Sequence, residues 1–426
     1  MKPVKSIKIC VIGLGYVGLP LARLFSTKYQ TVGFDMNQHR VDALMTGHDA
    51  TLEVSDDLLQ DAINNHGFVC TTDIEKIRDC NFYVVAVPTP VDEDDFPDLR
   101  PLIGASETVG KVISKGDIVV YESTVYPGVT EEECLPVVER VSGMKFNDDF
   151  FAGYSPERIN PGDKEHTVEK IKKVTSGSTP EIADIVDEVY NSVLINGTHK
   201  APSIKVAEAS KIIENSQRDV NIAFMNELAR IFNVMGIDTH DVIEAAASKW
   251  NFIKLSPGLV GGHCISVDPY YLIQKAQAYG VWPRIMMNAR RLNDMMGRYV
   301  GEQVIKMMNM KGVMVKDAKF LLLGVTFKEN CPDIRNTKVV DIYKSLHEYS
   351  NNITVFDPWA NAEHVMHEYN VPVVNSLPSD EKYDVVILAV AHREFLNIDI
   401  KSMLKENGLV YDVKGILPRN IVDGRL

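Results

Sequence analysis

A glycine-rich turn near the N-terminus has the spacing of a dinucleotide cradle. Gly13, Gly15 and Gly18 follow a short apolar run and open a helical pattern. Glycines at these positions permit a tight turn, close approach of a pyrophosphate and close packing of helix on strand. Asp35 follows Gly18 by 17 residues, where a carboxylate binds the ribose 2′-hydroxyl and repels a 2′-phosphate. The pattern therefore predicts NAD rather than NADP.

Further residues extend this predicted cofactor site. Ligands of open α/β sheets bind beyond the carboxyl ends of the strands, and Thr89 and Thr124 each follow a predicted strand. A turn or cap hydroxyl is the alternative for both threonines. Arg40 lies either over the adenine or ribose or on a solvated helix surface. In this half of the chain, the set beyond the glycines and Asp35 is Tyr16, Val17, Arg40, Pro88, Thr89 and Thr124.

A lone cysteine lies in the glycine-containing segment 259–269. Gly261 and Gly262 allow a backbone or a ligand to approach closely. The Cys264 thiolate would be a strong nucleophile if a cation or a helix N-terminus lowered its pKa. A small buried hydrophobic residue is the alternative. His263 could act as a base, although a structural histidine is the more common outcome.

Two other segments carry charged residues that could take part in catalysis or ligand binding. Lys211 and Asn215 are four residues apart in a helical pattern and project from one face. A lysine there could stabilise a developing oxyanion, and the residues alone favour the alternative, a solvent-facing pair of Glu208 and Lys211. Glu157 lies in a Pro- and Gly-containing loop, where it is either a general base for water or part of a capped surface turn. Its neighbours Arg158 and Asn160 could contact a polar ligand.

The C-terminal part carries a second set of cations. Lys328 and Arg335 follow its first predicted strand and suit a phosphate-bearing ligand. No clear glycine signature of the dinucleotide type follows that strand. This part is therefore predicted to bind something other than a dinucleotide.

The elements that must position these residues alternate between strand and helix at both ends of the chain. Runs that are apolar at nearly every position suit strands buried on both faces of a parallel sheet. Strands are predicted at 7–12, 31–34, 82–87, 117–121, 319–323, 353–356, 385–390 and 409–413. Helices are predicted at 19–26, 102–113, 201–236, 241–247, 284–310 and 337–348. The fold class is α/β, with two similar doubly wound, Rossmann-like domains (1–200 and 313–426) joined by a helical domain (201–312).

Composition narrows the class of protein. The chain has 426 residues, 45% of them apolar, and a formal net charge of −13, which argues against non-specific binding of nucleic acid. Its six cysteines form no C-x-x-C pair, so neither a metal site nor a disulfide framework is predicted, and a reducing, cytoplasmic setting is expected. No stretch approaches the ~18 apolar residues of a spanning helix, so a soluble protein without membrane partners is expected.

Taken together, these motifs resemble the nucleotide-sugar 6-dehydrogenases of the UDP-glucose and GDP-mannose dehydrogenase family. The resemblance runs nearly end to end, through GLGYVGLP, VPTP, ESTVYPG, SPERINPG, AEASKIIEN, PGLVGGHCISVDP and GVTFKENCPDIR. It implies an N-terminal NAD domain, a long central helix that forms a homodimer or a larger homo-oligomer, and a C-terminal UDP-sugar domain.

The resemblance also implies roles for single residues. Cys264 matches the family's nucleophile, and Lys211, Asn215 and Asp268 match its oxyanion- and water-handling group. Glu157 matches its loop glutamate, and Thr124 a hydroxyl beside cofactor and water. Arg335 is assigned to the cofactor side of the site. The implied substrate contacts are Glu157, Arg158, Asn160, Lys211, Phe252, Lys254, Gly261, Phe327, Lys328 and Lys414.

Residue differences from typical UDP-glucose dehydrogenases indicate which sugar substrate to expect. Those enzymes have a second glutamate where Pro161 stands, usually a hydrophobic residue at Arg158, and a lysine at Val267. The stretch GGHCISVDPYYL is similar to the branch that oxidises UDP-N-acetylhexosamines. The resemblance therefore implies oxidation of C6 of UDP-N-acetylglucosamine to the uronic acid, for surface polysaccharide precursors, with two NAD⁺ and a thioester on Cys264. The galacto and manno epimers and UDP-glucose are the alternatives.

Two hypotheses from other classes remain at this point. A two-electron 3-hydroxyacid dehydrogenase of related fold would need no cysteine and would yield one NADH per substrate rather than two. A non-catalytic NAD-responsive binding protein would tolerate loss of Lys211 and Cys264 and release no NADH.

Overall fold

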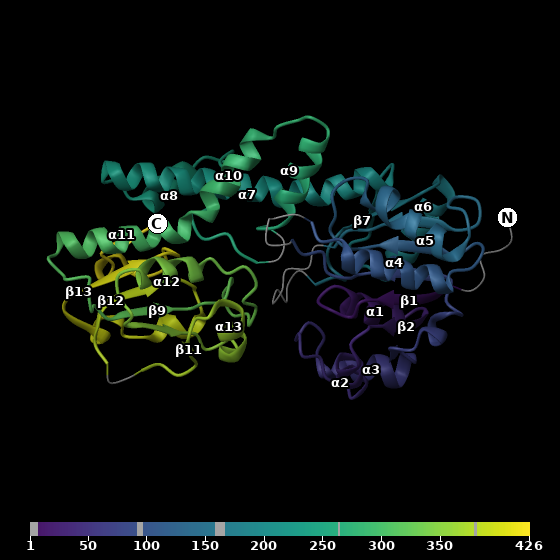
Figure 1. Ribbon diagram of the computed structural model, residues 1–426, viewed down its shortest axis with the longest axis horizontal. Coiled ribbons are helices and arrows are strands. Elements are labelled where there is room, and N and C mark those ends of the chain that lie inside the picture. Colours follow the sequence, from purple (N-terminus) through teal and green to yellow (C-terminus); the bar gives the residue numbers. More distant parts are fainter. Residues whose placement is uncertain (1–6, 92–96, 158–166, 263–264, 379–380) are drawn as a thin grey trace. The chain divides into compact units, whose positions relative to one another are not determined.

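The chain packs into two compact units (Figure 1), and the computed structural model describes residues 7–91, 97–157, 167–262, 265–378 and 381–426. The first unit comprises Met1–Glu214 and Tyr270–Tyr279, and the second comprises Asn215–Pro269 and Gly280–Leu426. The helical residues between 200 and 312 are thus divided between the units, and the division into three domains stays a prediction.

One eight-stranded sheet forms the centre of the first unit. Its order is β3-β2-β1-β4-β5-β6-β7-β8, and every neighbouring pair is parallel except β6 with β7. The four strands predicted in this half are confirmed as β1, β2, β4 and β5. The other four are short or carry polar residues, so their sequences lack the apolar run. The strands are β1 (Lys8–Ile12), β2 (Gln30–Phe34), β3 (Val69–Thr71), β4 (Phe82–Val85), β5 (Ile118–Tyr121), β6 (Phe151–Tyr154), β7 (Lys173–Gly177) and β8 (Thr198–Lys200).

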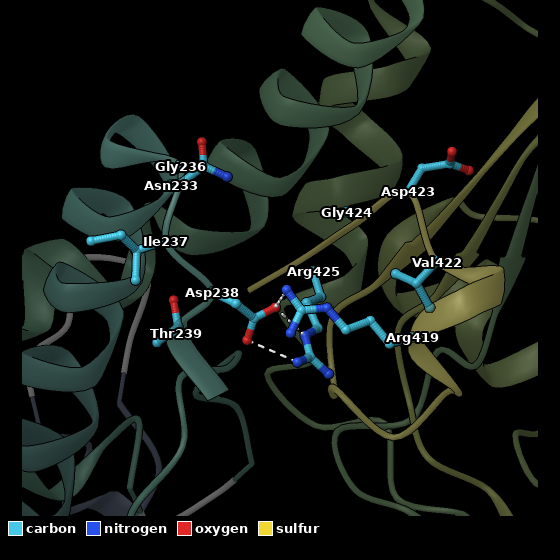
Figure 2. A pocket seen from close by; sticks show the side chains of 10 residues that line it. All are labelled: Asn233, Gly236, Ile237, Asp238, Thr239, Arg419, Val422, Asp423, Gly424 and Arg425. Atoms are coloured by element: carbon cyan, nitrogen blue, oxygen red, sulfur yellow. Dashed lines mark hydrogen bonds and ion pairs between the residues drawn. The ribbon is translucent and has the colours of Figure 1, made fainter. Parts of the chain in front are cut away.

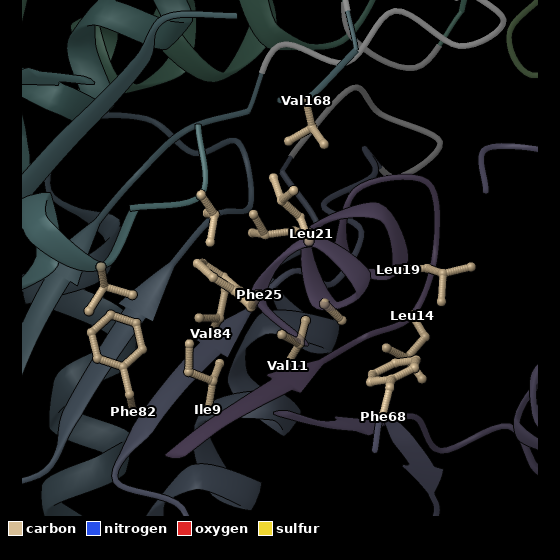
Figure 3. Packing of buried hydrophobic residues seen from close by; sticks show 14 of the residues in the cluster. Ile9, Val11, Leu14, Leu19, Leu21, Phe25, Phe68, Phe82, Val84 and Val168 are labelled. Carbon is tan, nitrogen blue, oxygen red and sulfur yellow. The ribbon is translucent and has the colours of Figure 1, made fainter. Parts of the chain in front are cut away.

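Helices cover both faces of this sheet because alternate residues of each strand point to opposite sides. Ile9 and Val11 of β1 belong to the core cluster under α1, and Figure 3 shows this cluster. Cys10 and Ile12 belong to the cluster that includes α4 and α5. The helices are α1 (Gly18–Ser26), α2 (Gln38–Met45), α3 (Asp56–His66), α4 (Arg100–Val112), α5 (Leu135–Ser142) and α6 (Pro180–Asn191), with a 3-10 turn η1 (Ile74–Ile77) and a π-turn η2 (Thr130–Cys134).

The predicted long helix is confirmed as α7 (Ile204–Met235), which contributes residues to both units. It is followed by α8 (Thr239–Ala247) and α9 (Asp268–Ala278). The single helix predicted over 284–310 is wrong, because α10 (Arg284–Asp294) and α11 (Met296–Met310) are separated at Met295, whose ψ of −8° departs from the helical value. Among the described residues, no helix has both the length and the apolar content needed to cross a bilayer.

The second unit contains a six-stranded parallel sheet in the order β11-β10-β9-β12-β13-β14. This order matches that of the first six strands in the first unit, so the predicted similarity of the two α/β parts is confirmed. Helix α12 packs closely on α11, because a Cβ at Gly297 would lie 2.6 Å from that of Asp341. The elements are β9 (Phe320–Leu323), α12 (Val339–His347), β10 (Ile353–Phe356), α13 (Ala362–Tyr369), β11 (Val373–Val374), β12 (Tyr383–Leu388), η3 (Arg393–Asn397), η4 (Ile400–Met403), β13 (Leu404–Asp412), η5 (Arg419–Ile421) and β14 (Gly424–Arg425).

A charged cluster ties the C-terminal strand of this unit to α8. Asp238 accepts a hydrogen bond from the Asp241 N–H and two from Arg425, both at 2.8 Å, and Arg419 lies beside them (Figure 2). Burial alone would raise the pKa of Asp238, but Arg425 and the backbone outweigh it and lower this pKa to about 2. The adjoining cavity of about 260 Å³ is lined by charged side chains that each have an ion-pair partner, within the lining or beside it.

Candidate active site

The glycine turn after β1 has the geometry of a dinucleotide cradle. Gly13 has φ +91°, a conformation that favours glycine. A Cβ at Gly18 would lie 1.8 Å from the Gly13 carbonyl oxygen, so Gly18 is required for the turn itself. A Cβ at Gly15 would meet nothing within 4 Å. Gly15 therefore leaves space beside the N-terminus of α1, where a pyrophosphate fits.

Asp35 lies where the second strand ends, as predicted. Its two carboxylate oxygens accept hydrogen bonds from the Leu14 and Asn37 N–H groups, each at 2.9 Å. Arg40 donates to the Leu14 carbonyl at 2.8 and 3.0 Å and pairs with Asp49 at 2.8 Å. The solvated-charge alternative for Arg40 is therefore wrong, because its guanidinium supports the glycine turn. The residues present fit NAD, with the Gly13–Gly18 backbone for its phosphates and Asp35 for its ribose.

The ends of the next two strands are joined by buried hydrogen bonds. The Thr89 hydroxyl donates to the Thr124 carbonyl at 2.8 Å, and the Tyr271 hydroxyl of α9 donates to the Thr89 carbonyl at 2.6 Å. Thr89 is buried, whereas Pro88 is exposed and Thr124 half-buried. Thr89 thus holds the strand ends in register, and Pro88 and Thr124 keep accessible surface at the carboxyl edge of the sheet.

Glu157 is buried rather than part of a surface turn. It is 4% exposed and lies 2.9 Å from the Lys173 ammonium, which also contacts Glu122 at 2.6 Å. Sequence reasoning missed Lys173 and Glu122. The available signals were a glutamate directly after the apolar strand β5 and a lysine that opens β7. Arg158, Asn160 and Pro161 lie outside the described residues.

The first turns of α7 do not carry the solvent-facing pair that the residues alone favoured. Glu208 is fully buried and accepts hydrogen bonds from the Gly128 and Thr130 N–H groups at 2.6 and 3.0 Å. Lys211 is 6% exposed, and within the described part of the chain its ammonium has neither a hydrogen-bond partner nor a carboxylate partner. A buried ammonium without a counter-charge is costly, so Lys211 is suited to an anionic ligand or intermediate.

One turn further along α7, the predicted partners Asn215 and Asp268 meet. The Asn215 amide donates to Asp268 Oδ2 at 2.5 Å, and both side chains are buried. Asp268 is the first residue of α9. Asn215 and Asp268 are 53 residues apart in sequence, and they meet where α9 begins.

The segment that leads to the cysteine is fixed by close backbone contacts. Gly262 donates its N–H to the Arg335 carbonyl at 3.1 Å, and the Asn336 amide donates to the Gly262 carbonyl at 3.2 Å. A Cβ at Gly261 would lie 2.7 Å from the Asn336 carbonyl oxygen, and one at Gly262 would lie 2.7 Å from the Phe327 ring. These glycines therefore serve close packing. His263 and Cys264 lie outside the described residues.

The remaining predicted contacts are distributed over the second unit. The Arg335 guanidinium pairs with Asp333 at 2.5 Å, and Lys414 lies 3.7 Å from Glu329. Lys254 is exposed, and Phe252 and Lys328 are half-buried. The structure brings Gly261, Phe327 and Arg335 together around one loop, but it records no contact that joins Phe252 or Lys254 to them.

An unpredicted polar cluster lies at the carboxyl edge of the second sheet. Asp357 follows β10 as Asp35 follows β2, and its Oδ2 accepts from the Val325 N–H at 2.7 Å. The same oxygen contacts His392 Nε2 at 3.1 Å, and His392 is fully buried. The carboxylate that would face a ribose is thus occupied by protein groups, which supports a ligand other than a dinucleotide.

The two glycines give a test that separates folding from cofactor binding. Gly15→Ala should leave the unfolding free energy unchanged, because its Cβ enters open space, and should weaken NAD⁺ binding about tenfold or more by crowding the phosphates. Gly18→Ala should cost about 1–3 kcal/mol of stability through the clash with Gly13. Urea unfolding and calorimetric titration measure the two effects, and equal losses of stability in both variants would contradict the assignment.

The comparisons with known proteins agree with this geometry. Models of the UDP-glucose/GDP-mannose dehydrogenase family match residues 7–194 (NAD binding domain), 205–295 (central domain) and 321–419 (UDP binding domain). The UDP-N-acetyl-D-glucosamine 6-dehydrogenases of Pseudomonas aeruginosa and Salmonella typhi are 57% and 55% identical, over 99% of this chain and 100% and 99% of theirs. The structure of the UDP-D-ManNAc dehydrogenase from Pyrococcus horikoshii superposes with a TM-score of 0.89 at 26% identity, covering 98% of both chains.

The geometry and the comparisons therefore agree. The chain carries the cofactor cradle and the buried α7 side chains, and it matches the two dehydrogenases named above over nearly their full length. The protein is an NAD-dependent nucleotide-sugar dehydrogenase and belongs to the UDP-glucose/GDP-mannose dehydrogenase family.

Proposed function

We propose that this chain oxidises the C6 hydroxymethyl group of UDP-N-acetylglucosamine to the uronic acid, with two NAD⁺ consumed per sugar. The observation that carries the proposal is Lys211, which is 6% exposed, has no carboxylate partner in the described part of the chain and lies one helical turn from Asn215, the partner of Asp268. A cation held in place before the reaction stabilises a negative charge that forms on the substrate. An alcohol that becomes an acid through a tetrahedral adduct develops that charge.

The choice of sugar follows the similarity between chains. The relatives at 57% and 55% identity are both named for UDP-N-acetyl-D-glucosamine, whereas the superposed UDP-D-ManNAc enzyme is only 26% identical. Pro161 and Val267 also stand where UDP-glucose dehydrogenases carry charged residues. The galacto and manno epimers and UDP-glucose are the comparison substrates of the assay.

Cys264 is proposed as the nucleophile of the second oxidation. Bound NAD⁺ supplies the hydride acceptor for each of the two oxidations. The C6 alcohol first loses a hydride and a proton and becomes an aldehyde. The Cys264 thiolate then attacks the aldehyde carbon, a C–S bond forms, and the carbonyl oxygen becomes an alkoxide that Lys211 and Asn215 stabilise. Loss of the second hydride from C6 leaves a thioester.

Water completes the reaction by breaking the C–S bond. Its oxygen attacks the thioester carbon, the thiolate leaves, and Asp268, Thr124 or Glu157 orients the water and receives its proton. In total, one alcohol, one water and two NAD⁺ give one carboxylate, two NADH and three protons. Holding the intermediate on sulfur keeps the reactive aldehyde from escaping.

The nucleotide half of the substrate is assigned to the second unit. The family's UDP binding domain covers residues 321–419, which include Phe327, Lys328, Arg335 and Lys414. Phe252, Lys254 and Gly261 are proposed beside them from the family resemblance, and Arg158 and Asn160 are proposed to contact the sugar. We place the reaction in the cytoplasm, where the five described cysteines, all buried and free, would stay reduced.

The exposed face of α7 supports a homodimer. Val206, Ile213, Phe224, Ile231 and Met235 are each 46–61% exposed. At 3.6 residues per turn they fall within roughly 40° of one another around the helix axis. This apolar stripe, which Gln217 interrupts between Ile213 and Phe224, favours burial against another copy of the same surface.

Replacement of the nucleophile should stop acid formation without loss of binding. Cys264→Ala should reduce uronate formation by about 1,000-fold or more, because no thioester forms, while the dissociation constants for NAD⁺ and UDP-sugar stay within about twofold. Wild type should yield two NADH per sugar by absorbance and mass spectrometry. Cys134→Ala, at a buried cysteine of the core cluster that includes α4 and α5, is the matched control. Full acid-forming turnover in Cys264→Ala would refute the covalent route.

Removal of the buried charge should separate stability from activity. Lys211→Met keeps roughly the length of the side chain and removes an ammonium without a carboxylate partner among the described residues, so thermal stability should stay equal or rise. The same change should lower kcat by about 100-fold or more, because the alkoxide loses its cation. Thermal unfolding and steady-state kinetics measure both, and a variant with lower stability but unchanged kcat would show that Lys211 is structural.

The apolar stripe predicts the assembly state. Wild type should sediment as a dimer or a larger homo-oligomer, and Phe224→Asp together with Ile231→Asp should shift it toward monomer, because buried charges oppose association. Glu227→Gln on the same helix serves as the control. A wild-type protein that sediments as a monomer at micromolar concentration would rule out the assembly.

A further inference from the structure

A buried lysine of the first unit is shared by two carboxylates. Lys173, the first residue of β7, lies 2.6 Å from Glu122 Oε2 and 2.9 Å from Glu157 Oε2. All three side chains are at most 3% exposed. The ammonium also donates to the carbonyl oxygens of Ser155 and Pro156, at 3.3 and 3.0 Å. Lys173 therefore holds both the Glu157 carboxylate and the backbone that leads to it.

The other oxygen of Glu122 is bound by an aromatic hydroxyl. Tyr190 of α6 donates to Glu122 Oε1 at 2.5 Å, and its ring centroid lies 5.5 Å from the Lys173 ammonium. Phe25 packs edge-on against Tyr190, with the ring centroids 5.2 Å apart. Burial, followed by the charge of Glu122, raises the pKa of Tyr190 far above its usual value, so the hydroxyl remains a donor. Both oxygens of Glu122 thus have protein partners.

The cluster sets one ammonium against two carboxylates. The groups that face Glu122 are Lys173 from β7, Glu157 from the segment after β6 and Tyr190 from α6. Burial raises the pKa of Glu122 to about 7, with Lys173 opposing and Glu157 reinforcing the shift. Burial alone would lower the pKa of Lys173, but the two carboxylates outweigh it and raise this pKa. Near neutral pH, Lys173 is therefore charged, and Glu122 is divided between its protonated and its ionised form.

Such a cluster is a poor means of stabilising a fold. The cost of removing charges from water commonly matches or exceeds their attraction, and apolar residues of the same volume do as well or better. Clusters of perturbed ionisable groups instead concentrate at functional sites. Glu157 is the member of this cluster that belongs to the loop assigned above to the water step. The arrangement therefore points to control of Glu157.

We propose that Lys173 and Glu122 are positioning residues for Glu157, and that the proton on Glu122 decides whether Lys173 serves one carboxylate or two. The inference rests on the proposed function, in which Glu157 takes part in thioester hydrolysis. With Glu122 protonated, the ammonium pairs with Glu157 alone and holds it firmly. With Glu122 ionised, a second carboxylate competes for the same ammonium. Hydrolysis should therefore be faster below the titration of Glu122 than above it.

The first experiment removes the titration and keeps the shape. Glu122→Gln resembles the protonated acid, so its hydrolysis rate should be flat within about 1.5-fold from pH 6 to 8. The wild-type rate should fall by up to about tenfold over the same range, because a single group that titrates near 7 changes its protonated fraction by that factor. Quenched single-turnover assays with UDP-N-acetylglucosamine, scored for uronate, measure this rate. Asp187→Asn is the matched control, because it alters a 2.6 Å contact with Thr175 that joins the same strand and helix.

The second experiment removes the cation. Lys173→Met should slow uronate release about 100-fold and let the thioester on Cys264 accumulate, as seen by intact-protein mass. The first-turnover yield of NADH should stay within about twofold of wild type. Lys173→Arg, which keeps a cation between the two carboxylates, should restore turnover to within about tenfold and prevent the accumulation. If Lys173→Met does not fold, Lys173→Arg and Glu122→Gln decide the question.

The outcomes distinguish this inference from the function on which it rests. A wild-type enzyme that makes uronate without an ionisation near pH 7 in hydrolysis overturns the positioning role and leaves the proposed function intact. A Glu122→Gln variant that keeps the wild-type pH profile does the same. A wild-type enzyme that makes no uronate from any UDP-sugar overturns the proposed function and the positioning role together.

Discussion

The proposed chemistry depends on a lysine side chain that has no carboxylate partner in the described part of the chain. Lys211 lies inside α7 with no carboxylate partner in the described part of the chain, although Glu208, one turn earlier, is fully buried on the same helix. Glu208 is held by the Gly128 and Thr130 N–H groups, so it cannot turn to neutralise the lysine. In the proposed mechanism, the ammonium stabilises a negative charge that forms on the substrate. A preorganised cation of this kind needs no reorganisation when an oxyanion forms.

Lys173 shows the opposite arrangement in the same unit. Its ammonium is surrounded by Glu122, Glu157 and two carbonyl oxygens, so it has nothing left to offer a ligand. Lys173 has several partners and orients the groups around it. Lys211 has none in the described part of the chain and is available to an anion. In the proposed mechanism, Lys173 therefore fixes the Glu157 carboxylate, and Lys211 stabilises the alkoxide.

Local patterns in the sequence predicted the elements that local interactions determine. The strands β1, β2, β4 and β5, the glycine turn and the long α7 follow from apolar runs, periodicity and glycine spacing. The predicted meeting of Asn215 with Asp268 came from the family resemblance, since no local rule joins residues so far apart in sequence. The Glu122–Lys173–Glu157 cluster was not predicted, because its members come from three strand ends and only the sheet order brings them together. For the same reason, the residues alone favoured a solvent-facing Glu208, whereas its side chain is buried.

The two sheets share the order of six strands, but the aspartate that follows the second of these strands has different partners in each unit. This difference matches their two ligand classes, NAD and UDP. In the first unit, Asp35 binds only backbone N–H groups in the recorded contacts, so its carboxylate edge is suited to a ribose. In the second, Asp357 binds the Val325, Thr326, Trp359 and Ala360 N–H groups and also His392. One buried histidine, stacked beside Trp359, thus uses an oxygen of the aspartate that corresponds to Asp35. The two sheets therefore differ at the carboxylate that binds a ribose in dinucleotide sites, although their strand order is the same.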